Sequence, residues 1–209
     1  AGDGLADVFT SLGVAAIIPG GQTMNPSTKE ILQAVKAVAA DKIIILPNNK
    51  NVVLTVQQVH SLTDKMIEVI PTETIPQGIA ALLAFDYEAD IEANIRLMGE
   101  AKSKVKTIEI TRAVRSASLN GLSIKKNQVI GLLDGELLST GNKPLDVLNK
   151  MLAKLNLKEM QIVTVYYGAD ATVAEAEMVS TGIREEHPQL QVEVVRCGQP
   201  HYDYIVSVE

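Results

Sequence analysis

The first half of the chain repeats one pattern three times: a short aliphatic run ending in proline, a polar turn, and an amphipathic stretch. The aliphatic runs cover residues 15–19, 42–47 and 66–71. Short β-branched runs that alternate with helical patterns indicate βαβ units around a parallel sheet. We therefore expect three parallel strands with right-handed crossovers. The helices between and after them are predicted at residues 29–40, from the turn after residue 47 to about residue 61, and at residues 78–85.

The second half has a different pattern. Residues 105–115 alternate between polar and apolar side chains, as in a half-exposed strand. Asn120-Gly121 and Asp134-Gly135 are typical of two-residue hairpin turns, which predicts antiparallel strands around them at residues 122–124 and 129–133. The remaining elements are predicted as helices at residues 87–104, 144–155 and 171–186, and as strands at residues 161–167, 191–196 and 204–208.

These patterns predict an α/β protein with two lobes that together form one module. The N-terminal lobe, residues 1–86, has a parallel sheet with flanking helices. The C-terminal lobe, residues 87–209, has a mixed, largely antiparallel sheet with helices. The chain begins with Ala1 in a helical-looking segment, which we interpret as a piece of a longer protein, with N-terminal processing as the alternative.

Composition excludes several classes of function. The formal charge is −6 and only 3% of the residues are aromatic, which argues against a nucleic-acid surface. No apolar run is long enough to span a membrane, and we expect no signal peptide. A single cysteine, Cys197, predicts a reducing cytoplasm. One cysteine and three scattered histidines are too few for a structural zinc site, so no metal site is predicted.

The first polar turn is the most informative segment for ligand binding. It lies between an expected strand and a helix start, where free backbone N–H groups and the helix dipole favour an anion. Thr23, Asn25 and Ser27 supply side-chain donors for a carboxylate or a phosphate. The alternative is ordinary capping, in which Ser27 or Asn25 caps the helix and Pro26 occupies its first turn.

Two further polar turns are expected beside the first, at the carboxyl edge of the sheet. Asn48 and Asn49 follow the second strand, and Thr72 and Thr74 follow the third, with Gln77 nearby. Together the three turns outline a cleft where ligands of α/β sheets usually bind. Turn and cap chemistry explains the same residues equally well.

Catalytic patterns are absent from the sequence. No nucleophile elbow, zinc-protease motif or pair of acids appears, so no catalytic residue is predicted. His201 is the best single candidate for a ligand contact. Arg112 and Arg115, on the middle strand, are candidates for contact with acidic groups of a partner, although a solvated face explains them as well.

Four blocks of the chain closely resemble one bacterial family: residues 20–28, 45–51, 70–82 and 198–200. They are similar to the C-terminal domain of the ATP-binding subunit of fatty acid kinase (FakA, or YloV-like), and the resemblance covers essentially the whole chain. It implies a DegV-like fold, the fold of the kinase's fatty-acid carrier, FakB. It further implies upstream domains that bind ATP and magnesium and phosphorylate the carrier-bound fatty acid to acyl phosphate for phospholipid synthesis.

The carriers' carboxylate loop resembles residues 23–27 here, and a second carrier stretch resembles residues 72–78. Met24 and Pro76 stand where the carriers have hydroxyl side chains. Each change removes a hydrogen-bond donor, and burying a carboxylate without donors costs on the order of several kcal/mol. We therefore expect a retained scaffold without tight fatty-acid binding.

The resemblance thus predicts a non-catalytic, cytoplasmic domain that docks the loaded carrier, without a cofactor of its own and within a homodimeric full-length protein. The alternative is a fatty-acid or small-anion binding module that uses the loop from Thr23 to Ser27. A free-standing enzyme is the third and weakest hypothesis.

Overall fold

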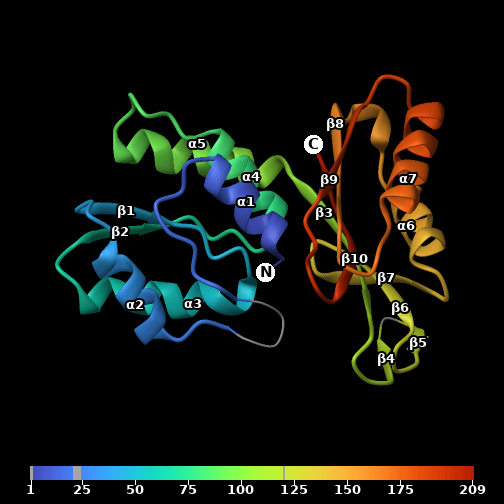
Figure 1. Cartoon of the computed structure of the whole chain (residues 1–209), viewed down its shortest axis with the longest axis horizontal. Helices are drawn as coiled ribbons and strands as arrows, with labels where there is room; N and C mark the ends of the chain where they lie inside the picture. Colours follow the sequence, from blue (N-terminus) through green and yellow to red (C-terminus); the bar gives the residue numbers. More distant parts are fainter. Residues whose placement is uncertain (1, 21–24, 120) are drawn as a thin grey trace. The chain divides into compact units, whose positions relative to one another are not determined.

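The computed structural model describes residues 2–20, 25–119 and 121–209 and has a mixed α/β architecture (Figure 1). Contacts within the chain separate two compact units. We call residues 6–105 the N-terminal unit, and residues 106–209 with residues 2–5 the C-terminal unit. Helix α1 (Asp3–Ser11) begins in one unit and ends in the other.

The N-terminal unit is built on two parallel strands, β1 (Lys42–Ile45) and β2 (Met66–Val69), as the repeated pattern predicts. Alternate side chains of β1 belong to two different apolar clusters. Ile43 and Ile45 pack with the cluster of α2 (Thr28–Ala37) and α3 (Lys50–Val59), and the 3-10 turn η1 (His60–Leu62) follows α3. Ile44 packs with the cluster of α4 (Ile75–Leu83) and α5 (Ile91–Lys104). Helices therefore cover both faces of this small sheet.

The prediction of the first strand is wrong, because residues 14–20 form neither helix nor strand. Ala15, Ala16 and Ile17 are exposed, and only Ile18 packs against the aliphatic core. Alanine has a low preference for strands and Pro19 has no N–H to donate to a ladder. The run is therefore too weak a strand to extend the sheet in the described part of this unit.

The C-terminal unit contains a six-stranded sheet with the order β7-β6-β3-β10-β8-β9. All neighbours are antiparallel except β8 and β9, which are parallel and joined through α7. Side chains of α6, α7 and one face of this sheet form the largest aliphatic cluster. The elements are β3 (Lys106–Arg112), β6 (Val129–Leu133), β7 (Glu136–Gly141), α6 (Pro144–Leu152), η2 (Leu157–Glu159), β8 (Ile162–Tyr167), α7 (Val173–Glu186), β9 (Gln191–Arg196) and β10 (Tyr202–Val208).

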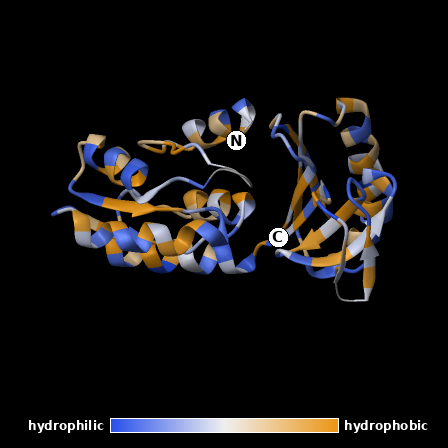
Figure 2. Cartoon of the chain, turned by 90° about the horizontal axis from the view of Figure 1, so that it is seen from below, coloured by the Kyte–Doolittle hydropathy of each residue, from blue (hydrophilic) through white to orange (hydrophobic). Residues whose placement is uncertain are grey.

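Both predicted hairpins occur in this unit. Leu133 of β6 pairs with Glu136 of β7, and the turn residues Asp134 and Gly135 both have positive φ, 49° and 81°. This is the backbone of the twisted two-residue turn that Asp-Gly favours. The other hairpin joins β4 (Ala117–Leu119) to β5 (Leu122–Ile124) outside the main sheet; Asn120 of its turn lies outside the described residues. Figure 2 shows the hydrophobic residues concentrated along the strands of each unit.

The two units meet in the sequence after Val105, whereas the predicted lobes divide after residue 86. The difference is the placement of α5, which packs against α4 in the N-terminal unit. Its Met98 shares a buried cluster with Ile70 and Ala81, and Lys102 Nζ donates to the Pro71 carbonyl at 2.8 Å. No helix in the described residues is long and apolar enough to cross a membrane.

Candidate functional site

The turns that follow β1 and β2 meet through a pair of hydrogen bonds between Asn48 and Thr72. The Asn48 amide donates to Thr72 Oγ1 at 3.0 Å, and Thr72 Oγ1 donates to Asn48 Oδ1 at 2.8 Å. Thr72 is fully buried, and Asn48 has φ 54°, in the left-handed region that asparagine tolerates better than most residues. The two predicted turns thus lie together at the carboxyl edge of the strands, and their side chains satisfy each other.

Gly78 is a close-packed position beside this pair that was not among the predicted site residues. A Cβ atom there would lie 2.1 Å from Asn48 Oδ1, so any other residue would have to displace the Asn48 side chain from its hydrogen bond with Thr72. The available signal was a glycine placed early in a predicted helix, where it costs helix stability unless close packing requires it.

The remaining predicted residues of the second and third turns, Asn49, Thr74 and Gln77, form capping contacts at helix starts. Asn49 Oδ1 accepts from the Asn51 amide at 2.9 Å at the start of α3, and the Thr74 hydroxyl accepts from the Gln77 amide at 3.3 Å at the start of α4. Gln77 Oε1 in turn accepts from the Glu73 amide at 2.8 Å. Capping therefore occupies Asn49, Thr74 and Gln77, and the pair described above occupies Asn48 and Thr72.

The first turn is only partly described, since Thr23 lies outside the described residues. Asn25 Oδ1 accepts from Asn49 Nδ2 at 3.4 Å, which joins the first turn to the second. Ser27 forms a capping box with Glu30, whose carboxylate accepts from the Ser27 amide at 2.8 Å and hydroxyl at 2.7 Å. These hydrogen bonds lower the pKa of Glu30 and keep it ionised.

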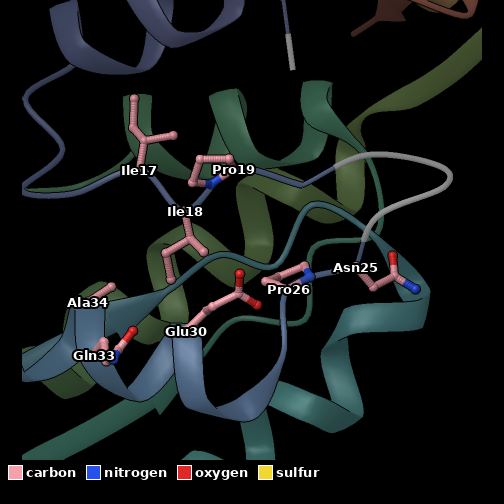
Figure 3. A pocket seen from close by; sticks show the side chains of 8 residues that line it. All are labelled: Ile17, Ile18, Pro19, Asn25, Pro26, Glu30, Gln33 and Ala34. Atoms are coloured by element: carbon pink, nitrogen blue, oxygen red, sulfur yellow. The ribbon is translucent and has the colours of Figure 1, made fainter.

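A pocket of about 280 Å³ lies beside this capping box. Figure 3 shows its lining, which is Ile17, Ile18, Pro19, Asn25, Pro26, Glu30, Gln33 and Ala34. The ionised Glu30 is the only charged side chain among them, so the lining repels an anion. Of the two polar side chains predicted here that the structure describes, one bonds Glu30 and the other bonds Asn49.

His201 and the two predicted arginines belong to the C-terminal unit, whereas the turns described above belong to the N-terminal unit. His201 is exposed with φ 73°, and its carbonyl accepts a hydrogen bond from Thr111 Oγ1. Arg112 ends β3, with its guanidinium 3.8 Å from the carboxylate of the buried Asp203. Arg115 is exposed beyond the end of β3.

Asp203 is a buried acid that the sequence patterns did not single out. Burial raises its pKa, Arg112 opposes the rise, and the negative charges of Asp170 and Glu175 add to it. A carboxyl group with a pKa raised by folding binds its proton more readily in the folded state. The stability that Asp203 contributes is therefore fully present below the pKa of the unfolded state, about 3.9. It is lost as pH rises through the higher pKa of the folded state.

We predict that Asp203→Asn will flatten part of this pH dependence. As pH rises from about 4, the free energy of unfolding of the variant should increase relative to that of the wild type, because the amide carries no charge to bury. Urea denaturation at a series of pH values measures the difference. Glu159→Gln, at an exposed position, is the control. Parallel curves for Asp203→Asn and wild type would contradict the prediction.

Neither a metal-binding cluster nor a reactive cysteine is found in the described residues. They contain no cluster of three His, Cys, Asp or Glu side chains that could hold a metal ion. Cys197 is fully buried, and burial raises the pKa of its thiol to about 12. It is therefore protonated at neutral pH and unreactive as a nucleophile.

Comparison with known proteins places this arrangement in a family. The model of the FakA-like C-terminal family of fatty acid kinase matches residues 1–209. The chain belongs to this family. It is 41% identical over 208 residues to protein YloV of Bacillus subtilis, and it covers 38% of that protein. It is 38% identical over 208 residues to an uncharacterised protein of Staphylococcus aureus, again covering 38%. The chain thus spans about two fifths of the length of these relatives.

Solved structures confirm the predicted fold. A DegV family protein of Corynebacterium glutamicum aligns over 97% of this chain and 92% of its own, with a TM-score of 0.71 and 12% identity. The Streptococcus pneumoniae fatty acid kinase B3 protein, solved with linoleic acid, aligns over 88% of this chain and 76% of its own, with a TM-score of 0.63 and 13% identity. At these identities the likeness establishes the DegV-type fold.

Proposed function

We propose that the chain is the non-catalytic carrier-docking domain of a fatty acid kinase. In this role it binds the fatty-acid-loaded FakB carrier so that upstream domains can phosphorylate the fatty acid to acyl phosphate for phospholipid synthesis. Family membership supports the kinase assignment. The observation that carries the docking role is a carrier-type fold in which the described side chains of the polar turns are occupied by internal contacts.

The occupied turns argue against a ligand-binding role for this edge. Thr72 and Asn48 use their side chains on each other, and the Ser27 hydroxyl donates to Glu30. A fatty-acid carboxylate entering here would have to displace those contacts and approach the Glu30 charge. Breaking a buried hydrogen-bond pair leaves unsatisfied groups at about 1–3 kcal/mol each.

The rest of the proposal concerns the full-length protein. ATP and magnesium would bind upstream domains, and this domain would need no cofactor of its own. The kinase would act in the cytoplasm as a homodimer with the carrier as its partner, and it would bind neither nucleic acid nor the membrane through a spanning segment.

Calorimetric titration of the purified chain with a fatty-acid-loaded FakB carrier tests the docking role. We expect saturable binding with one-to-one stoichiometry, and no binding to an unrelated fatty-acid-binding protein such as serum albumin. Failure to bind the carrier at any salt concentration would exclude the docking role. Salt must be varied because charges at the rim of an interface mainly change the association rate and its salt dependence.

The second candidate function is binding of a fatty acid or a small anion by the loop from Thr23 to Ser27. The pocket beside Asn25 favours it, and the Glu30 carboxylate in the pocket opposes it. Native mass spectrometry of the purified chain distinguishes the two functions. A co-purifying fatty acid, lost in Asn25→Ala, would support the binding module, and a spectrum of the bare chain would support docking.

A further inference from the structure

Residues 112–128, which we call the basic arm, carry charge of only one sign in an otherwise acidic chain. Four cations, Arg112, Arg115, Lys125 and Lys126, lie in it, and no acidic residue occurs between Glu109 and Asp134. The whole chain carries −6, so the residues outside the arm carry a formal −10. Strands β4 and β5 form the arm's hairpin, which is separate from the six-stranded sheet (Figure 1).

Backbone pairing at the base of the arm gathers the cations from two distant segments. The Lys126 amide donates to Ser116 Oγ at 3.0 Å. The Ala113 amide donates to the Gln128 carbonyl at 2.9 Å, and the Asn127 amide donates to the Ala113 carbonyl at 2.7 Å. The segment that carries Arg115 therefore runs antiparallel to the segment that carries the two lysines, and all three cations lie around one end of the hairpin.

Three of the four cations are available to a partner. Arg112 faces Asp203 within the unit. Arg115, Lys125 and Lys126 are exposed and form no ion pair with any residue that the structure describes. A hollow of about 330 Å³ lies beside the two lysines and is lined by Lys125, Lys126, Asn127, Gln128, Val129, Gly141 and Asn142. This lining contains two cations and no acid, and it can accept a carboxylate side chain.

We propose that the basic arm is the docking element for an acidic surface of the fatty-acid carrier. The proposal rests on the carrier-docking function and names the part of this chain that performs it. Clustered charges of one sign accelerate encounter with an oppositely charged protein by about 10- to 1000-fold at low salt. The acidic remainder of the chain repels the same surface, so the arm also selects the orientation of the carrier.

A basic carrier surface would instead meet the exposed acids before and at the start of α5. Glu88 and Glu92 are exposed, and no cation occurs between Lys65 and Arg96. The arm is favoured because it combines exposed cations with an adjacent hollow. The choice between the two surfaces is open to direct test, because both can be neutralised without removing a capping residue.

The test compares three charge-neutralised variants of the chain with wild type for binding to the loaded carrier, at about 50 mM and about 300 mM salt. The arm variant is R115Q/K125Q/K126Q. The matched control, K150Q/K154Q/K158Q, removes the same charge from exposed lysines of the same unit. The third variant, E88Q/E92Q, neutralises the acidic alternative. Circular dichroism melting confirms that each variant is folded.

We expect the arm variant to lose about tenfold in association rate at the lower salt concentration, and to lose most of the salt dependence. The control and E88Q/E92Q should bind as wild type does. If the arm variant binds the carrier as wild type does, the basic arm is not the docking element, and the docking function itself still holds. The arm would also be excluded as the docking element if the variant lost only its binding to phosphatidylglycerol vesicles, or only its self-association, and still bound the carrier. No carrier binding by wild type would overturn both proposals.

Discussion

Gly168→Ala is expected to destabilise the C-terminal unit by about 3 kcal/mol or more. A Cβ atom at this position would lie 1.9 Å from the Tyr202 carbonyl oxygen and 2.7 Å from that of Gln199. Both atoms belong to the backbone, and the same segments are held together by hydrogen bonds. The Gly168 amide donates to the Asp203 carbonyl at 3.0 Å, and the Ala169 amide donates to the Gln199 carbonyl at 3.1 Å. Relieving the clash therefore breaks these bonds.

The matched control is Gly182→Ala, in the middle of α7 in the same unit. A Cβ atom at Gly182 meets nothing within 4 Å, so alanine should stabilise the helix by about 0.5–1 kcal/mol. Urea denaturation followed by circular dichroism measures both changes. Equal midpoints for Gly168→Ala and wild type would show that the junction of the loops after β8 and β9 is looser than its contacts indicate.

Thr72→Val is expected to lower the stability of the N-terminal unit by about 2–4 kcal/mol. The substitution keeps the shape of the side chain but removes its hydroxyl. The Asn48 amide then loses its acceptor, and Asn48 Oδ1 loses its donor, beside Gly78. The position is fully buried, so water cannot replace the lost partners without entering the core.

Thr72→Ser distinguishes the contribution of the hydroxyl from that of the methyl group. It keeps both hydrogen bonds and should cost about 1 kcal/mol, the value of one buried methyl group. Hydrogen exchange of α3 and α4 amides provides a local readout, since these helices begin at the turns that Asn48 and Thr72 join. A larger loss in the serine variant than in the valine variant would show that packing, rather than the hydrogen-bond pair, holds the turns together.

Short-range patterns in the sequence were sufficient to locate most elements. Asp134-Gly135 predicted a hairpin because both residues accept positive φ, and the structure has that backbone. Ser27 followed by Glu30 forms the capping box that begins α2, as the capping alternative for this turn required, but Pro26 precedes the cap and does not lie in the first turn as expected. Helix starts and hairpin turns depend on interactions between residues about two to four positions apart, so adjacent residues are enough to determine them.

The aliphatic run at residues 15–19 shows where such patterns fail. Whether a short run becomes a strand depends on a partner strand and on burial, and neither is encoded locally. The same limit applies to α5, which packs with α4 because of the cluster that Met98 shares with Ile70 and Ala81. Helical periodicity predicted this helix correctly but carried no information about which lobe it joins.

For the candidate site, the sequence determined which residue types follow each strand. Its four family-like blocks also indicated the family. Only the tertiary structure decided that Asn48 and Thr72, 24 positions apart, satisfy each other, and that Gly78 is where α4 meets them. It also decided that Arg112 faces Asp203 while Arg115 joins Lys125 and Lys126 at the base of one hairpin. Hydrogen bonds and charges act over a few ångströms in space, and the fold determines which distant residues come within that range.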